Sequence, residues 1–301
     1  KTASISIIGS GKVAKSLVQG YLHAGFPKSS LTVYARSTSA KLSWFQGVVN
    51  VETSYETLGE VQCIILAVTP GGAQSVLKDI QLSLPKRRVP VFSFVSTLTV
   101  TTIKRLLRID GKLVVRGMLN TNIDTGNGLF IFGLVGHENE KKLMSLTQEL
   151  FGKLGVIEYV RGAPLLDKAI AGVGSMNAYA LTQLYASASG LQAIGYSEKD
   201  AVRMALLTMQ SAVSAMLASG DTTLQSLLDR IATVTTKGGC TEEQVAHLLD
   251  VFLKEFDVAM RKTHKKAMTF KKFANKYTKI RPQNCETDFF ILILILILFR
   301  I

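Results

Sequence analysis

The stretch ASISIIGSGKVA, residues 3–14, decides the fold of this chain. The apolar run Ala3–Ile8 predicts a short strand, and two glycines follow it directly. Beyond them, Lys12–Ala24 carries its apolar residues at helical spacing, and Gly25 stands where a helix ends. A strand, a glycine turn and a helix in this order are typical of the first unit of a dinucleotide-binding α/β domain.

The turn between strand and helix has the residue types that a phosphate needs. Gly9 permits the tight turn, Gly11 lets the backbone approach a pyrophosphate, and Ala14 lets the helix pack closely on the strand. The N–H groups at the helix start then favour an anion. The alternative is a glycine turn in a similar domain that binds no cofactor. The predicted cofactor loop consists of Gly9, Ser10, Gly11, Lys12, Val13 and Ala14.

Strand-like and helical segments alternate as far as about residue 162. A helix is expected over Ala73–Ile80, opened by Pro70. The further strands expected are Leu31–Ala35, Cys63–Val68, Val89–Val95, Lys112–Val115, Gly128–Val135 and Val156–Val160. Such alternation predicts a mainly parallel sheet, so residues 1–162 are expected to form a Rossmann-type α/β domain.

The pattern becomes purely helical after a boundary at Arg161–Pro164. Helices are expected over Ala169–Ile194, Glu198–Ser219, Leu224–Ile231, Thr241–Leu249 and Leu249–Phe270. Residues 163–270 are therefore expected to form an all-α domain. Its apolar, small-residue composition favours a homodimer or higher homo-oligomer, with a monomeric helical domain as the alternative.

The end of the chain differs from the rest in charge and composition. Residues 261–301 hold ten Lys/Arg and two Asp/Glu, so they carry most of the net charge of +13. No base-stacking or recognition motif accompanies the charge, which argues against nucleic-acid binding. The run Phe289–Phe299 would span only about 16 Å as a helix, too short for a membrane. Residues 271–301 are expected to be a disordered tail, with a membrane anchor as the weaker alternative.

The residues after the second strand bear on the choice of cofactor. NAD-binding domains place an acidic residue there for the ribose hydroxyls, and this chain has none in residues 34–38. Arg36 can pair with a 2′-phosphate, and Ser37 and Thr38 can donate hydrogen bonds. The sequence therefore predicts NADP(H), with NAD(H) as the alternative, unless Arg36 is an ordinary solvated arginine.

The amino-acid composition limits which class of protein this chain can be. A hydrophobic content of 47% with 19% charged residues fits a globular protein with a sizeable core. Three scattered cysteines give neither a disulfide framework nor a metal motif. A cytoplasmic location is expected, or a mitochondrial one if a targeting segment precedes Lys1.

Four short strings, in order behind the cofactor loop, carry a resemblance to a known family. They are Val68-Thr69-Pro70, Met118-Leu119-Asn120-Thr121-Asn122, Gly174-Ser175-Met176-Asn177-Ala178-Tyr179 and Val234-Thr235-Thr236-Lys237-Gly238-Gly239-Cys240-Thr241. These resemble V-K-P, M-P-N-T-P, G-S-G-P-A-Y and V-T-S-P-G-G-T-T of pyrroline-5-carboxylate reductase. The resemblance covers about residues 3–265.

The resemblance implies a Rossmann domain, an interlocking helical dimerisation domain, and NADPH-dependent reduction of 1-pyrroline-5-carboxylate to proline without a metal. The N–H groups of Gly238 and Gly239 would hold the substrate carboxylate, and Thr236 would lie against the substrate. Thr241 would lie nearest the ring nitrogen, as the catalytic side chain. The resemblance also implies cofactor contacts for Asn120, Val68, Thr69 and Pro70, and a substrate contact for Asn120.

Several positions depart from the family pattern. Leu119 and Asn122 replace two prolines, and Met176-Asn177 replaces Gly-Pro. Lys237 replaces a fourth proline, Ser96-Thr97 replaces an Ala-Gly pair beside the nicotinamide end, and the acids of the long helix become Tyr185 and Ser189. Structural roles are also open: Asn120 as a loop stabiliser, Gly238-Gly239 as an interhelical turn, and Thr241 as a helix cap.

Three other functions compete with proline formation. A related two-domain reductase would act on a different small imine or keto substrate, although the long helix lacks the lysine that β-hydroxyacid and ketone reductases generally use. A non-catalytic NADP-binding sensor or interaction protein would explain altered substrate loops behind an intact cofactor loop. Nucleic-acid binding through the basic tail is the third. If the chain does not bind nucleic acid, its expected partners are a small-molecule substrate and further copies of the chain. Neither a membrane nor a nucleic acid is expected as a partner.

Overall fold

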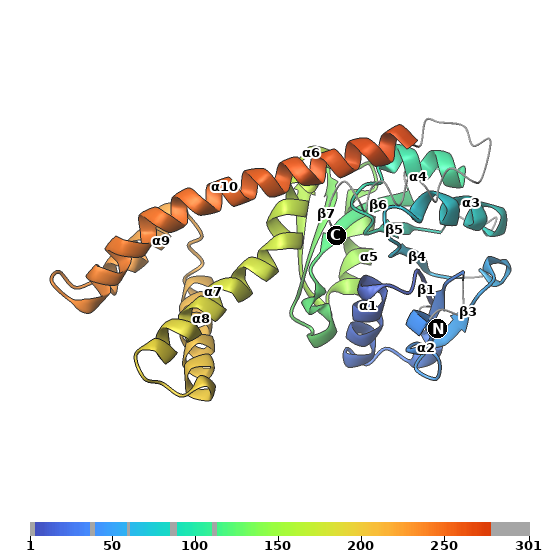
Figure 1. The fold of residues 1–301 in the computed structure, drawn as a ribbon. Helices are drawn as coiled ribbons and strands as arrows, with labels where there is room; N and C mark the ends of the chain where they lie inside the picture. Colours follow the sequence, from blue (N-terminus) through green and yellow to red (C-terminus); the bar gives the residue numbers. More distant parts are fainter. Residues whose placement is uncertain (1–3, 37–39, 59–60, 85–88, 110–112, 278–301) are drawn as a thin grey trace.

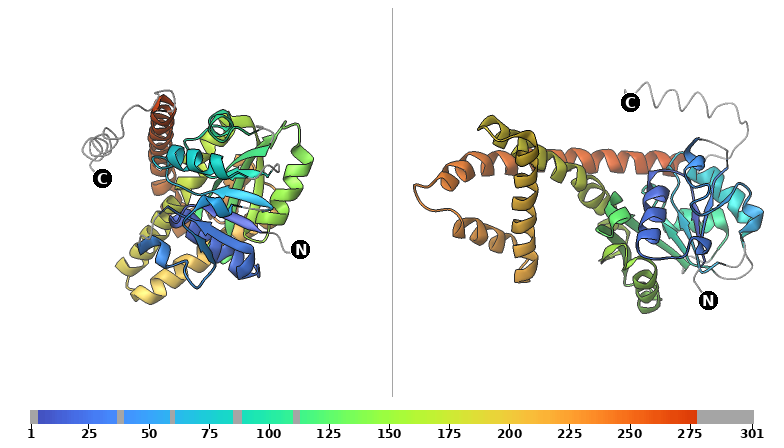
Figure 2. Two further views of the ribbon diagram at one scale, coloured as in Figure 1. Left: turned by 90° about the vertical axis from the view of Figure 1, so that its right-hand side faces the viewer. Right: turned by 90° about the horizontal axis from the view of Figure 1, so that it is seen from below.

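The computed structural model describes residues 4–36, 40–58, 61–84, 89–109 and 113–277. They form two parts, a sheet with helices around it and a set of helices that extends away from it (Figure 1). The first part, residues 4–161, is called the dinucleotide domain, and helices α7 to α10 are called the helical arm. The right-hand view of Figure 2 shows the arm projecting beyond the dinucleotide domain.

The sheet has eight strands in the order β3-β2-β1-β4-β5-β6-β7-β8. Their bounds are Ile5–Ile8 (β1), Leu31–Tyr34 (β2), Asn50–Glu52 (β3), Cys63–Leu66 (β4), Val91–Ser93 (β5), Val114–Leu119 (β6), Gly128–Val135 (β7) and Gly155–Arg161 (β8). Every neighbouring pair is parallel except β6 and β7. The predicted mainly parallel sheet is thus confirmed, with its order reversing between β1 and β4, where such domains bind ligands.

Helices cover both faces of the sheet because its central strands are apolar on both sides. Successive residues of β1 point to opposite faces, so Ile7 packs with α1 and α5 whereas Ile8 packs with α3 and α4. The helices are Lys12–His23 (α1), Ala40–Ser43 (α2), Ala73–Ser83 (α3), Val100–Leu107 (α4) and Glu140–Phe151 (α5). Short 3₁₀ turns lie at Lys28–Ser30 (η1), Tyr55–Thr57 (η2) and Thr121–Thr125 (η4).

The helical part begins directly after β8, at Gly162. Its elements are Gly162–Ala169 (α6), a π-helical turn at Ile170–Gly174 (η5), Ser175–Ala193 (α7), Glu198–Ser219 (α8), Leu224–Thr233 (α9) and Cys240–Tyr277 (α10). Local signals set their ends: Ser197 accepts a hydrogen bond from the Asp200 N–H at the start of α8, and Gly220 ends that helix with φ +69°.

Two predictions at the end of the chain are wrong. Residues 240–270 form one helix, not two, and the helix continues to Tyr277, so residues 271–277 are not a disordered tail. Neither glycine nor proline interrupts this stretch, and ion pairs one turn apart, Asp250 with Lys254 and Asp257 with Arg261, support the continuous helix. The rest of the predicted tail, residues 278–301, lies outside the described residues.

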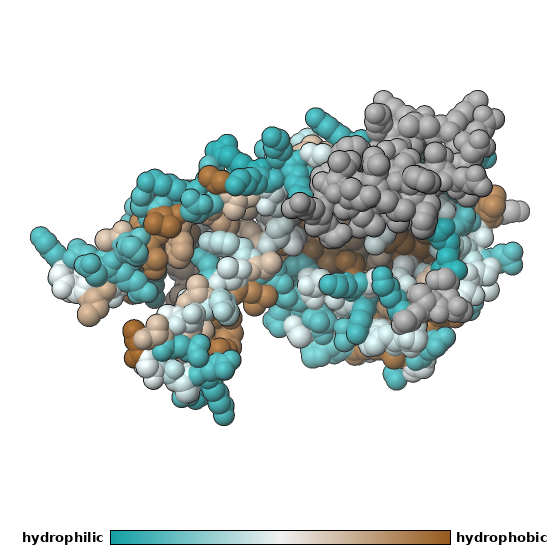
Figure 3. Space-filling model, viewed as in Figure 1, coloured by the Kyte–Doolittle hydropathy of each residue, from teal (hydrophilic) through white to brown (hydrophobic). Residues whose placement is uncertain are grey.

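The helical arm buries little of its own apolar surface. Its one buried cluster consists of alanines, Ala188 on α7 with Ala201 and Ala205 on α8, and none of the described residues of α9 is buried. Large apolar side chains are exposed along the arm, as the brown patches in Figure 3 show. They include Tyr185, Ile194, Val213, Leu217, Leu224, Val234 and Leu253. Within the described part of the chain, α8 is also the one helix long and apolar enough to cross a membrane.

Candidate cofactor and substrate site

Two glycines shape the cofactor loop: Gly9 packs tightly against the neighbouring backbone, and Gly11 leaves open space for a phosphate. Gly9 has φ +124°, and a Cβ there would lie 2.5 Å from the carbonyl oxygen of Ala67. A Cβ on Gly11 would meet nothing within 4 Å, so the backbone N–H groups at this end of α1 are approachable. Ala14 is fully buried where α1 crosses the sheet. The loop therefore has the shape that a pyrophosphate requires.

The start of α1 leaves its own N–H groups for a ligand. Gly11 is its N-cap, and among the described residues no side chain caps the helix and no acidic residue stands in its first turn. Lys12 is exposed at this helix end and Ser10 is half-buried beside it, while Val13 packs against the core. The positive end of the helix and the lysine together favour an anion.

Arg36 lies at the end of β2, as predicted, and faces the start of α3. Its Nη1 donates to Ser75 Oγ at 2.6 Å and lies 3.5 Å from Asp79 Oδ2. Nearly half of each charged side chain is exposed, so a phosphate can compete for the guanidinium. Ser75 and Asp79 were not among the predicted residues, because only the fold brings α3 to the end of β2. Ser37 lies outside the described residues.

Val68, Thr69 and Pro70 follow β4 and lie beside the cofactor loop. Val68 Cγ1 is 3.1 Å from the position of a Cβ on Gly9. A Cβ on Gly72 would lie 3.6 Å from Thr69 Oγ1 and 3.9 Å from Arg36 Nη2. These residues therefore connect the phosphate loop to the arginine, and their contact with a cofactor stays a prediction.

Asn120 is held in its loop by the neighbouring strand. Its Oδ1 accepts a hydrogen bond from the Leu129 N–H at 3.1 Å, and its own N–H donates to the Leu129 carbonyl at 3.2 Å. The role that the structure gives Asn120 is thus the stabilisation of the loop after β6. That strand runs to Leu119, four residues beyond the predicted end, so Met118 and Leu119 lie in the sheet rather than in the loop.

Two departures from the family pattern contact each other. Asn122 and Asn177 exchange hydrogen bonds, with Nδ2 of Asn122 3.2 Å from Oδ1 of Asn177 and the reciprocal pair at 2.9 Å. Nearby, a Cβ on Gly174 would lie 3.5 Å from Met118 Cε. The structure therefore brings together the second and third motifs and joins the dinucleotide domain to the first turn of α7 through a pair of amides.

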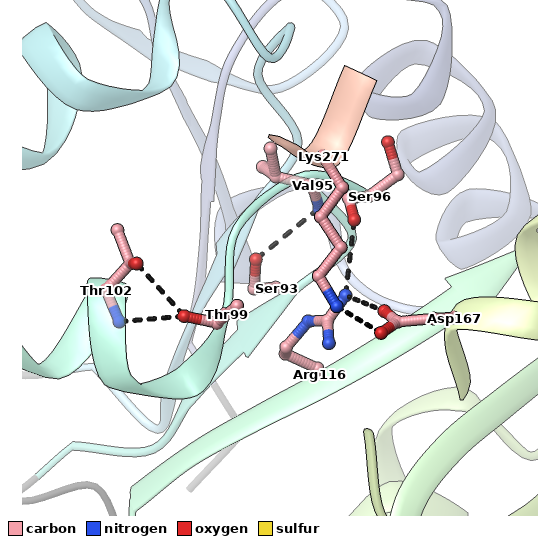
Figure 4. Close-up of polar contacts among 8 residues, drawn as sticks. All are labelled: Ser93, Val95, Ser96, Thr99, Thr102, Arg116, Asp167 and Lys271. Carbon is pink, nitrogen blue, oxygen red and sulfur yellow. Dashed lines mark hydrogen bonds and ion pairs between the residues drawn. The ribbon is translucent and has the colours of Figure 1, made fainter. Parts of the chain in front are cut away.

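The loop after β5 presents a buried hydroxyl at the carboxyl edge of the sheet. The Val95 N–H donates to Ser93 Oγ at 3.4 Å, and Thr99 Oγ1 caps α4 by accepting from the Thr102 N–H at 3.1 Å (Figure 4). Between them Thr97 is 3% exposed, and its Oγ1 has no hydrogen-bond partner among the described residues. A buried hydroxyl of this kind fits a ligand that supplies the missing partner.

The fourth motif lies elsewhere. Thr236, Gly238 and Gly239 lie in the turn between α9 and α10, and Thr241 is the second residue of α10, at the end of the arm remote from β1 and α1 (Figure 1). Within one chain the structure does not bring them to the cofactor loop, because α7 and α8 carry them away from the sheet. Gly238, with φ +74°, makes this turn, and its N–H donates to Glu242 Oε2 at 2.6 Å. Sequence reasoning assigned that N–H to a substrate carboxylate and gave Glu242 no such role.

Comparison with known proteins covers both parts of the chain. Residues 164–270 match the family model described as pyrroline-5-carboxylate reductase dimerisation, and residues 4–92 match that of the coenzyme F420-dependent NADP oxidoreductases. The pyrroline-5-carboxylate reductase of Vibrio alginolyticus is 24% identical over 275 residues, covering 88% of this chain and 98% of the relative. That of Pisum sativum is 28% identical over 242 residues, covering 79% and 85%.

Solved structures show the same fold. A pyrroline-5-carboxylate reductase from Coxiella burnetii superposes with a TM-score of 0.75 at 23% identity, covering 90% of this chain and 99% of the other. The Plasmodium falciparum pyrroline carboxylate reductase with NADP bound gives a TM-score of 0.74 at 22% identity, covering 89% and 98%. The predicted two-part fold, a Rossmann-type domain followed by a helical dimerisation domain, is confirmed.

Proposed function

We propose that this chain, a divergent member of the pyrroline-5-carboxylate reductase family, reduces 1-pyrroline-5-carboxylate to proline as a homo-oligomer in the cytoplasm. NADPH supplies the hydride for this reduction of a C=N bond. The observation that carries the proposal is an intact dinucleotide loop on the same chain as residues 164–270, which match the family's dimerisation domain. The small molecule and further copies of the chain are its proposed partners.

Different residues of the dinucleotide domain bind different parts of the cofactor. The N–H groups at Gly11 and Lys12 receive the pyrophosphate, since the start of α1 is open and uncapped. Arg36, with Ser75 beside it, receives the 2′-phosphate, which accounts for a preference for NADP(H) over NAD(H). Thr97 fits the nicotinamide end, where its buried hydroxyl lacks a protein partner in the described chain.

The substrate half of the site needs a second copy of the chain. The turn at Gly238-Gly239 is remote from the cofactor loop of its own chain, and the arm that carries it exposes apolar side chains. When two arms pack together, each turn can approach the cofactor of the other copy. Such an arrangement covers the exposed apolar face of α8 and completes two sites at once.

The roles of the turn residues follow from the family resemblance. Backbone N–H groups of Gly238 and Gly239 hold the substrate carboxylate, and Thr236 packs against the ring. The hydroxyl of Thr241 donates a hydrogen bond to the ring nitrogen, which orients the imine carbon for reduction. Because the Gly238 N–H bonds the carboxylate of Glu242 and the Gly239 N–H bonds the Thr236 carbonyl oxygen at 2.9 Å, the substrate must displace both acceptors to bind.

The decisive experiment measures NADPH oxidation by the purified protein with 1-pyrroline-5-carboxylate, together with NADPH binding by fluorescence. We expect both. Thr241→Ala should lower turnover much more than affinity for NADPH, whereas Arg36→Ala should weaken NADPH more than NADH. Equal losses of turnover and affinity in Thr241→Ala would remove Thr241 from the substrate site.

A second candidate is a sensor that binds NADP(H) without catalysis. It is favoured by the contact between the Gly238 N–H and Glu242, which places a protein carboxylate where the substrate carboxylate is expected. Binding of NADPH without turnover would select this candidate. Absence of both binding and turnover would contradict the cofactor assignment itself.

A further inference from the structure

Three charged side chains meet under the carboxyl edge of the sheet, outside the residues considered so far. Arg116 comes from β6, Asp167 from α6 and Lys271 from α10 (Figure 4). Lys271 follows immediately after residues 164–270, the segment that matches the dimerisation family. The last turns of α10 thus return to the dinucleotide domain through a contact that the family match does not include.

The geometry of the cluster is specific. Nη2 of Arg116 donates to Asp167 Oδ1 at 3.0 Å and to the Ser96 carbonyl oxygen at 3.2 Å. The ammonium of Lys271 pairs with the other oxygen of the same carboxylate. The side chains of Arg116, Asp167 and Lys271 are 5%, 7% and 15% exposed, so solvent screens these charges little.

The cluster bears on the loop that faces the nicotinamide end of the cofactor. Ser96 follows β5, and Thr97, with its buried hydroxyl, is the next residue. In a sheet of this order the ring lies beyond the carboxyl ends of the strands on the β4–β5 side. The hydrogen bond from Arg116 to Ser96 therefore helps to fix a segment that would contact the reacting ring.

We infer that Lys271 is a positioning residue: it holds the Asp167 carboxylate so that Arg116 keeps its bond to Ser96 and the nicotinamide loop stays in place. This inference rests on the proposed reductase function. Lys271 itself contacts neither the substrate nor the cofactor. It acts through two buried side chains, and it links the last helix to the loop after β5.

The unpaired nitrogen of Arg116 explains why the lysine matters. Nη1 of Arg116 is buried and has no partner within the described parts of the chain. Without Lys271, the Asp167 carboxylate can turn to accept from both guanidinium nitrogens, the geometry that arginine and carboxylate favour. Nη2 would then move away from the Ser96 carbonyl oxygen. Lys271 opposes this rearrangement because its ion pair with the second carboxylate oxygen holds the carboxylate in its present orientation.

The test replaces Lys271 by an apolar side chain of similar length. In Lys271→Met we expect kcat to fall about tenfold while the Kd for NADPH changes less than about threefold, because a small displacement near the ring affects hydride transfer more than binding. Lys271→Arg should restore most of the activity. Lys272→Met, one position along on an exposed side chain, is the matched control and should leave kcat unchanged. Melting temperatures of all variants separate positioning from simple stability.

Each outcome supports or overturns the inference. An unchanged kcat in Lys271→Met would overturn the inference, whether or not the melting temperature falls. A loss of kcat in Lys272→Met equal to that in Lys271→Met would also overturn it. If the wild type itself shows no turnover, the proposed function fails instead. Amide hydrogen exchange at residues 96–97 of the NADPH-bound protein then tests Lys271 alone: faster exchange in Lys271→Met supports the inference, and identical exchange contradicts it.

Discussion

The two parts of the molecule bury their apolar residues in different ways. The dinucleotide domain forms two clusters of fully buried side chains, one on each face of the sheet. Among its described residues the helical arm has a single buried cluster of three alanines, while large apolar side chains along it are exposed. This difference fits the proposed homo-oligomer, in which the first part buries its apolar residues within one chain and the second has them covered by another copy.

The same difference separates the two halves of the proposed site. Gly9 and Arg36 take their geometry from contacts within one chain, so the cofactor half is assembled in the monomer. Gly238 and Thr241 stand on the arm, so their place relative to the cofactor depends on assembly. Cofactor binding and catalysis should therefore be separable by mutation.

The largest effect is expected from breaking the arm interface. Val213 and Leu217 lie one turn apart on α8 and are 59% and 71% exposed. Val213→Asp with Leu217→Asp should give monomers and lower turnover at least about 100-fold, because the site loses its partner turn. NADPH affinity should stay near that of the wild type. Sedimentation equilibrium, the rate of NADPH oxidation and NADPH fluorescence measure the three results.

Leu82 provides the control for this variant. It is 86% exposed on α3 in the dinucleotide domain, so Leu82→Asp makes one apolar-to-aspartate change of the same kind away from the arm. We expect an unchanged oligomer and unchanged turnover. A double variant that stays dimeric and active would show that the arm surface of α8 is not the interface.

The second prediction distinguishes a glycine needed for the stability of the dinucleotide domain from a glycine needed for cofactor binding. Gly9→Ala should lower the free energy of unfolding by about 3 kcal/mol, since a Cβ would overlap the Ala67 carbonyl at a positive φ. Gly11→Ala meets no protein atom, so it should unfold like the wild type but lose NADPH affinity. Urea unfolding and NADPH fluorescence give the two numbers. Loss of stability in both variants alike would mean that Gly11 serves packing rather than phosphate binding.

The sequence predicted the dinucleotide domain better than the arm for a physical reason. A parallel sheet buried on both faces leaves continuous apolar runs such as Cys63–Leu66, which can be recognised locally. Several elements escaped this reasoning: β3 and α2 have four residues or fewer and α4 has eight, but α5, with twelve, was missed as well. The long α10 was divided at Leu249, although neither glycine nor proline breaks the helix there.

For the site, sequence reasoning found loops but not the contacts between them. The cofactor loop and Arg36 follow from residue types at fixed places in a βαβ unit. Ser75 beside Arg36, and Lys271 beside Asp167, depend on elements far apart in the chain, for which no local signal exists. The remoteness of Gly238 from the cofactor loop is likewise a property of the arm's direction rather than of its sequence motif.

The smallest effect concerns the joint between the two regions. Asn122 and Asn177 replace two expected prolines and bond each other across it, so each should depend on the other. Asn122→Ala and Asn177→Ala should show a coupling free energy of about 1 kcal/mol in a double-mutant cycle of unfolding, since either change leaves one amide without its partner. The double variant with both prolines restored should keep more activity than either alanine variant. Strictly additive losses would mean that the two amides do not act together and that other contacts orient α7 on the dinucleotide domain.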